Sequence, residues 1–184
     1  MTSLNESAMQ QAREKWDNVA HPLHGLGLME DMVVQIAGIT GSADISLDKK
    51  QVFVFCGDNG ISETAVSQSD SSVTAMVADE IAEGKSSVNR MADVAGAEVS
   101  CIDVGIKDAT HSFNIIHRNV IRGTKNFINE PAMTPDEAEK CLEAGTNALR
   151  ESDADIIAVG EMGIADTTCA SVITASLLHL TADD

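Results

Sequence analysis

The sequence predicts an α/β protein with a parallel β-sheet and helices packed against it. Three short apolar runs lack polar alternation, which is typical of strands buried on both faces. Helical patterns alternate with these runs, and that order predicts right-handed βαβ units. The chain has 184 residues with one Trp, four Phe and no Tyr, so its core must be aliphatic, as suits packed α/β layers. The runs are residues 52–56, 99–105 and 156–160.

The expected helices follow from the spacing of apolar residues and from the turn residues at their ends. One helix is expected over residues 135–150, with Thr134 as its N-cap and Pro135 in its first turn. Gly38 and Gly41 end another. The remaining helices are expected over residues 4–19, 28–38, 71–82, 86–95 and 167–180.

The formal net charge of −17 disfavours binding to nucleic acids and to anionic membranes. No run approaches the roughly 18 apolar residues of a membrane helix, and residues 1–18 lack the apolar segment of a secretory signal. We therefore expect a cytoplasmic protein. No pair of cysteines has metal-site spacing, so no metal or cofactor is expected, and Cys56 and Cys101 are interpreted as buried thiols.

Polar residues follow each predicted strand. Asp58 comes after the first, Asp103 lies in the second, and Glu161 follows the third. Because ligands of open α/β sheets bind at the carboxyl ends of strands, we expect the three carboxylates to meet at one site. Asp58 either orients a loop or contacts substrate. The long polar segment 107–133 is expected to be functional or to form a subunit contact.

The loop over residues 159–168 is the strongest candidate for ligand binding. Gly160 and Gly163 permit a close approach of the backbone. Thr167 and Thr168 begin the following helix, whose positive end can hold a phosphate. The alternative is a turn that has Asp166 as N-cap and needs no ligand.

Glu161 is a candidate acid or base. It stands at the carboxyl end of a strand, beside apolar Met162 and Ile164, where its pKa could be raised. The alternative is a solvated or ion-paired loop carboxylate.

Together these residues resemble the nicotinate-nucleotide–dimethylbenzimidazole phosphoribosyltransferase family. The resemblance extends over the whole chain and is most specific in its last two blocks. The matching blocks are VVQIAGI (33–39), FCGDNGI (55–61), VS (66–67), VT (73–74), AGAE (95–98), IDVG (102–105), RGTKNF with PAMT (122–134) and GEMGI with TT (160–168).

The resemblance implies a Rossmann-like parallel sheet with flanking helices and a small helical domain, assembled as a homodimer. Residues 1–41 would be an N-terminal helical segment of that small domain. Residues 42–184 would be an incomplete Rossmann-like α/β domain.

The resemblance also implies a reaction. Phosphoribose would move from nicotinate mononucleotide to dimethylbenzimidazole, giving α-ribazole phosphate for the lower ligand of cobalamin. The partners would be this small-molecule nucleotide and azole base. Glu161 would be catalytic. The substrate-binding residues would be Asp58, Ser67, Met76, Met162, Gly163, Ile164, Asp166, Thr167 and Thr168.

This sequence departs from the family pattern at several positions. Members are longer, and their further part carries the glutamate that serves as general base and a phosphate-binding lysine. The chain is therefore expected to be truncated, and weakly active or inactive. The alternative is a non-catalytic binding or assembly subunit that keeps the fold. The departures are His21 for Lys, Asn59 for His, Asp70 for Pro, Met76 for Gln and Asp166 for Asn.

Overall fold

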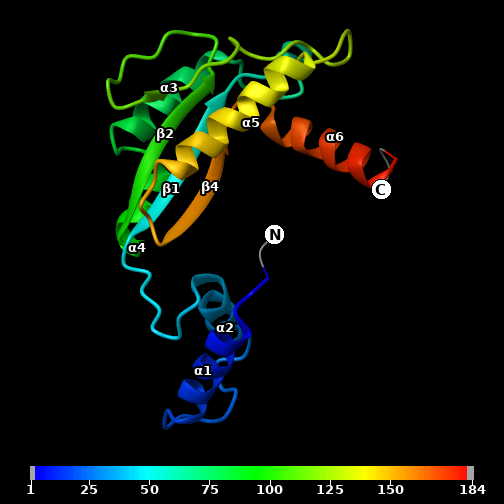
Figure 1. The fold of residues 1–184 in the computed structure, drawn as a ribbon. Coiled ribbons are helices and arrows are strands. Elements are labelled where there is room, and N and C mark those ends of the chain that lie inside the picture. The colour runs from blue at the N-terminus through cyan, green and yellow to red at the C-terminus, as the bar shows by residue number, and fades with distance from the viewer. Residues whose placement is uncertain (1–2, 182–184) are drawn as a thin grey trace. The chain divides into compact units, whose positions relative to one another are not determined.

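A computed structural model describes residues 3–181. The chain forms two compact units, and the boundary between them in the sequence lies between Asp48 and Lys49 (Figure 1). In the first unit α1 (Glu6–Asp17) packs against α2 (Leu28–Thr40). Ala43 and Ile45 pack against the same small core, so this unit extends past residue 41, where the sequence analysis placed a domain boundary. The core residues are Ala8, Ala12, Val34 and Ala37.

The second unit contains a parallel sheet of four strands in the order β3-β2-β1-β4. This confirms the predicted α/β fold. In its register Val54 of β1 lies beside Cys101 of β2 and Gly160 of β4. The short β3 was not predicted. The strands are β1 (Lys50–Gly57), β2 (Ala97–Gly105), β3 (Ile116–His117) and β4 (Ile156–Met162).

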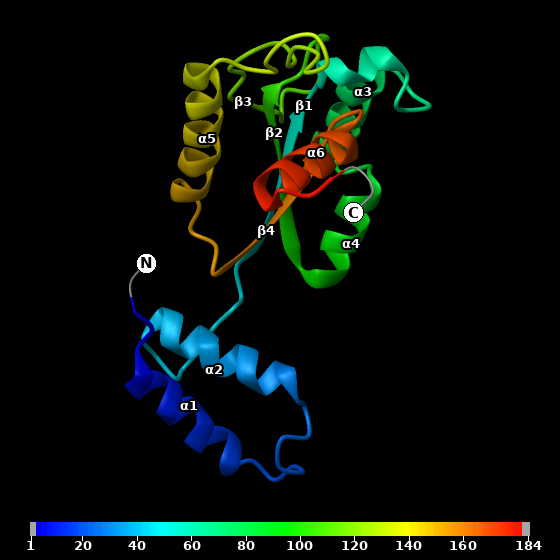
Figure 2. The same ribbon diagram turned by 90° about the vertical axis from the view of Figure 1, so that its right-hand side faces the viewer.

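Helices cover both faces of the sheet (Figure 2). Helices α3 (Ser72–Ala82) and α4 (Ser87–Ala95) lie on one face, and α5 (Pro135–Arg150) lies on the other. Side chains of β1 alternate accordingly: Val54 belongs to the core cluster that includes residues of α3, whereas Phe53 is in the cluster with Ala148 of α5. The remaining elements are the short 3-10 helix η1 (Gly60–Thr64) and α6 (Asp166–Leu178).

Helix α5 has the predicted bounds and N-cap. The Thr134 hydroxyl accepts from the Glu137 amide at 3.3 Å, and the Glu137 carboxylate accepts from the Thr134 amide at 2.7 Å. This reciprocal pair satisfies two amides that the helix itself leaves unbonded. Within the described part of the chain, no helix combines the length and the apolar character needed to cross a membrane.

The expectation that β4 is buried on both faces is wrong. Val159 is 66% exposed and Ile156 is 44% exposed, whereas Phe53 and Val54 of β1 are buried. The physical reason is position: β4 is the edge strand of the described sheet, and the α6 helix that follows it has no buried residue.

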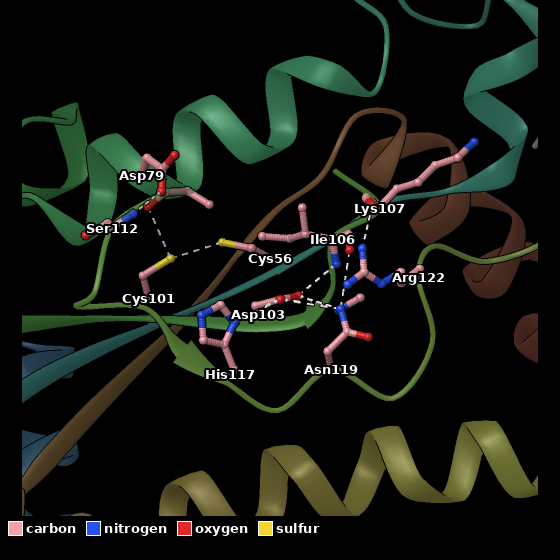
Figure 3. A network of polar contacts seen from close by, with 12 residues as sticks. Cys56, Asp79, Cys101, Asp103, Ile106, Lys107, Ser112, His117, Asn119 and Arg122 are labelled. Atoms are coloured by element: carbon pink, nitrogen blue, oxygen red, sulfur yellow. Dashed lines mark hydrogen bonds and ion pairs between the residues drawn. The ribbon is translucent and has the colours of Figure 1, made fainter. Parts of the chain in front are cut away.

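Cys56 and Cys101 are buried free thiols, as predicted. Their sulfur atoms are 3.5 Å apart, and Cys101 also lies 3.4 Å from the Ala78 carbonyl of α3 (Figure 3). The contact with Cys101, together with burial, raises the pKa of the Cys56 thiol. Both cysteines are therefore core residues.

Candidate functional site

A cavity of about 340 Å³ opens at the carboxyl ends of β1 and β4. This is where the topology of an open α/β sheet places ligands. We call it the strand-end pocket. Its apolar walls come from both central strands, from the segment between β3 and α5, and from α6. These wall residues include Phe55, Val104, Ile121, Met133 and Ile173.

The polar end of the pocket carries the carboxylates of Asp58, Glu161 and Asp166. Among the described residues that line the pocket there is no Lys, Arg or His. Asp58 is only 5% exposed; its Oδ2 accepts from the Lys107 amide at 2.8 Å, whereas its Oδ1 has no hydrogen-bond partner among the described residues. This end of the pocket is therefore lined by carboxylates, and the unpartnered Oδ1 of Asp58 is buried.

Asn59 joins the end of β1 to the loop that precedes α6. Its Nδ2 donates to Asp166 Oδ1 at 2.6 Å and to the Ile164 carbonyl at 3.1 Å. Its Oδ1 lies 3.2 Å from the Cys169 sulfur, which donates to it. In the sequence, Asn59 stands out only as a departure from the family pattern. The one local signal for its role was its place directly after Asp58 at the end of the strand.

Burial and, after it, a hydrogen bond with Glu161 raise the pKa of Asp166 to about 7, while the hydrogen bond from Asn59 acts in the opposite direction. Two carboxyl groups in contact resist losing both protons. Near neutral pH Asp166 therefore holds a proton that can be given up or taken back. Such a pair is suited to acid–base chemistry.

Asp166 is not the N-cap of α6, so that reading of the loop was wrong. The N-cap is Ala165, in the left-handed region with φ 73°, and Asp166 is the first residue of the helix. The Asp166 side chain faces Asn59 and Glu161 because the loop bends back against the end of β1. A Cβ on Gly163 would lie 2.1 Å from the Gly57 carbonyl oxygen, so only glycine fits this bend.

The expected phosphate cradle is smaller than the sequence indicates. The Ile164 amide already donates to the buried Thr74 hydroxyl of α3 at 3.3 Å. The Thr168 amide donates to the Ala165 carbonyl at 3.1 Å. Thr167 is exposed on α6 and does not line the strand-end pocket.

The structure brings together Asp58, Glu161 and Asp166 out of the predicted site residues. The other predicted contacts lie elsewhere: Ser67 is in the loop after η1, and Met76 projects from α3 with 57% of its surface exposed. Met162 packs against the core cluster on the α3 face of the sheet. Neither Ser67 nor Met76 lines the strand-end pocket.

Asp103 does not join the other two strand-end carboxylates, which corrects the expectation of three. Its Oδ1 accepts from the amides of Gly105 at 3.0 Å and Ile106 at 2.8 Å, and its Oδ2 lies 3.2 Å from His117 Nδ1 (Figure 3). Asn119 also donates to it at 3.1 Å. The hydrogen bonds of Asp103 therefore hold the end of β2 against the segment that contains β3.

The polar segment between β3 and α5 forms one wall of the pocket. The Thr124 amide donates to the Asp58 carbonyl at 2.9 Å, and the Thr124 hydroxyl accepts from the Gly60 amide at 3.1 Å. A Cβ on Gly60 would lie 2.4 Å from the Lys125 carbonyl carbon, so this close packing requires glycine. The lining residues of this segment were not predicted, because long-range packing decides them.

Known proteins with similar sequences identify the family of this chain. The sequence model of a phosphoribosyltransferase family matches residues 1–184. The chain belongs to this family. A relative from Clostridium acetobutylicum, named nicotinate-nucleotide–dimethylbenzimidazole phosphoribosyltransferase, is 37% identical and matches 100% of this chain and 53% of its own length. A Geobacter relative with the same name is 38% identical over 94% of this chain and 51% of its own.

A solved structure of the same family has the same fold as this chain. The crystal structure of the Thermus thermophilus protein named nicotinate-nucleotide–dimethylbenzimidazole phosphoribosyltransferase matches with a TM-score of 0.90 at 32% identity. It covers 96% of this chain and 55% of the Thermus chain. The chain thus spans about half the length of the relatives that it matches.

Proposed function

We propose that this chain provides the strand-end part of a transferase site that moves phosphoribose from nicotinate mononucleotide to dimethylbenzimidazole. The product would be α-ribazole phosphate, used in cobalamin lower-ligand assembly. The observation that carries the proposal is the strand-end pocket, which joins an apolar slot to a proton-holding carboxyl pair in a member of this family. The names of the relatives support the choice of substrates.

The proposed chemistry needs a proton acceptor. A ring nitrogen of the azole attacks the anomeric carbon, the bond from that carbon to the pyridine nitrogen breaks, and nicotinate leaves. The other azole nitrogen then loses its proton. We assign this proton to Glu161, which lies at the pocket and is hydrogen-bonded to Asp166.

Contacts to the nucleotide by the loop residues Gly163, Ile164, Thr167 and Thr168 are proposed from the family resemblance. Assembly as a homodimer and residence in the cytoplasm are proposed on the same basis. Because the chain spans about half of its relatives, we expect slower transfer than in those longer proteins.

A transfer assay tests the proposed function. The chain is incubated with both substrates, α-ribazole phosphate is measured by mass spectrometry, and the Clostridium acetobutylicum relative serves as positive control. We expect slow product formation that falls about 10²- to 10⁴-fold in the Glu161→Gln variant, the usual effect of removing a general base. A rate unchanged in that variant would refute the role of Glu161. Ligand binding without any product would favour the non-catalytic subunit.

A further inference from the structure

Asn59 lies where the end of β1, the loop before α6 and α6 itself come together. Its Nδ2 donates to the Ile164 carbonyl at 3.1 Å and to Asp166 Oδ1 at 2.6 Å. Its Oδ1 accepts from the Cys169 thiol at 3.2 Å. If the amide were turned by 180°, its oxygen would face two acceptors, so only one orientation satisfies all three contacts. An N–H group of Asn59 therefore points at Asp166 Oδ1.

The loop before α6 holds the Asp166 carboxyl from a second side. A Cβ on Gly163 would lie 2.6 Å from Asp166 Oδ1 and 2.9 Å from Oδ2, so the carboxyl occupies the space that the glycine leaves. The Asp166 amide donates to the Gly163 carbonyl at 3.2 Å. The Asp166 carboxyl is thus fixed in direction, and it lines the strand-end pocket together with Glu161.

This fixed direction decides which oxygen of Asp166 carries its proton. A protonated carboxyl group accepts hydrogen bonds best through its carbonyl oxygen and donates one through its hydroxyl. Oδ1 already accepts the short bond from Asn59, so the proton belongs on Oδ2. The Asp166 carboxyl is hydrogen-bonded to Glu161, which is the acceptor available to this proton.

We propose that Asn59 is a positioning residue that directs the Asp166 proton, on Oδ2, toward Glu161. The inference rests on the proposed function, in which the azole N–H bond breaks as an O–H bond forms on Glu161. The hydrogen bond from Asp166 Oδ2 orients the Glu161 carboxylate for this step, and Glu161 afterwards releases the azole proton to water. Asn59 acts through Asp166 and does not need to touch a substrate.

The ionisation of Asp166 is the property through which this role can be measured. Burial and the contact with Glu161 raise the pKa of Asp166 to about 7, and the bond from Asn59 opposes them because it stabilises the charged carboxylate. Burial raises the pKa of the Cys169 thiol, so Asp166 is the neighbour of Asn59 that titrates at neutral pH. The titratable groups that interact with Asp166 are Glu161 of β4, Cys56 of β1, Asp58 directly after β1 and Cys169 of α6.

NMR of the Asn59 side-chain amide, recorded without substrates, tests the contact directly. We expect its signals to shift with pH, with a midpoint of about 7, because the acceptor Oδ1 gains negative charge. This pH dependence should be lost in Asp166→Asn. The matched control Asp93→Asn removes the same charge from the exposed surface of α4 and should leave the pH dependence unchanged. Asn59 signals that stay constant between about pH 5 and 9, or that still titrate in Asp166→Asn, would overturn the proposal.

The variant Asn59→Ala tests whether this contact directs the proton. Loss of the donor should raise the midpoint of the Asp166 side-chain carboxyl ¹³C signal by about one pH unit, as expected for losing a hydrogen bond to a charged group. The Glu161 carboxyl signal should show a step at the Asp166 midpoint in the unaltered chain, and this step should move with it in the variant. The control Asn129→Ala, at an exposed position between β3 and α5, should move neither. An unmoved midpoint, or a Glu161 signal without that step, would refute the positioning role.

These titrations separate the role of Asn59 from the proposed function. If Asn59→Ala does not fold, as judged by circular dichroism, the Asn59 titration in the unaltered chain and in Asp166→Asn still decides the outcome. None of the samples contains a substrate. A failed transfer assay would therefore refute the proposed function alone, whereas a failed titration would refute the role of Asn59 alone.

Discussion

Among single residues, Asp166 carries a carboxyl group whose pKa the fold raises. Burial and the neighbouring Glu161 raise its pKa to about 7, against roughly 3.9 for an unperturbed aspartate. The folded state therefore binds more protons than the unfolded state between these two values. By linkage, this group lowers the stability of the fold as pH rises from about 4 to about 7, and the loss is complete above the folded pKa.

The Asp166→Asn variant should remove this pH dependence. Asp166 is only partly buried, so we discount the full linkage value to about 1–2 kcal/mol. Urea unfolding should show the variant close to the original chain at pH 5 and more stable by that amount at pH 8. For the control Asp93→Asn, the difference in unfolding free energy from the original chain should be the same at pH 5 and pH 8. If the difference in unfolding free energy for Asp166→Asn is also the same at both pH values, Asp166 does not have a raised pKa in the folded chain.

Some residues of the candidate site could be predicted from sequence and others could not. Asp58 and Glu161 were identified because each directly follows a predicted strand, where the topology of parallel sheets places ligands. Asn59 and Cys169 contact each other across 110 residues of chain, a pairing that no local pattern contains. The use of Asp103 as an anchor for backbone amides was equally hidden, because its partners include Asn119 on a segment without regular structure.

At the scale of elements, the sheet is well buried at β1 and open at β4. Side chains of β1 alternate between a cluster with α3 and a cluster with α5, which gives both of its faces a partner. Val159 of β4 is 66% exposed, in contrast to Val54 at 4%. Two valines on neighbouring strands thus experience very different surroundings.

A matched pair of substitutions measures this contrast. Val54→Thr places a hydroxyl in the core and should cost about 1–3 kcal/mol of unfolding free energy. Val159→Thr makes the same chemical change at an exposed position and should cost less than about 0.5 kcal/mol. Chemical denaturation of both variants provides the comparison. Equal losses would show that β4 is as buried in solution as β1.

The helix α5 could be predicted from the sequence, whereas the strand β3 and the exposure of β4 could not. The bounds of α5 could be predicted because a capping box and a first-turn proline mark its start locally. The strand β3 could not, because its two residues are defined only by pairing with β2. The exposure of β4 was missed because an apolar run reports hydrophobicity and not the neighbours that would cover it.

For the whole molecule, the net charge and the length of the chain limit how it can bind its proposed substrates. The net charge of −17 opposes anionic ligands at long range, and the strand-end pocket adds three carboxylates at short range. We therefore expect the proposed nucleotide to be held by local contacts. The chain belongs to the phosphoribosyltransferase family and spans about half the length of its relatives.

We propose that the substrates bind at the carboxyl ends of β1 and β4. NMR tests this through the chemical shifts of the backbone amides, measured before and after benzimidazole and nicotinate mononucleotide are added. We predict that the largest changes fall in residues 57–60, 121–124 and 161–169, while residues 6–40 and the helix α4 stay unchanged. Changes concentrated in residues 6–40 or in α4, with the strand-end residues unaffected, would contradict the account.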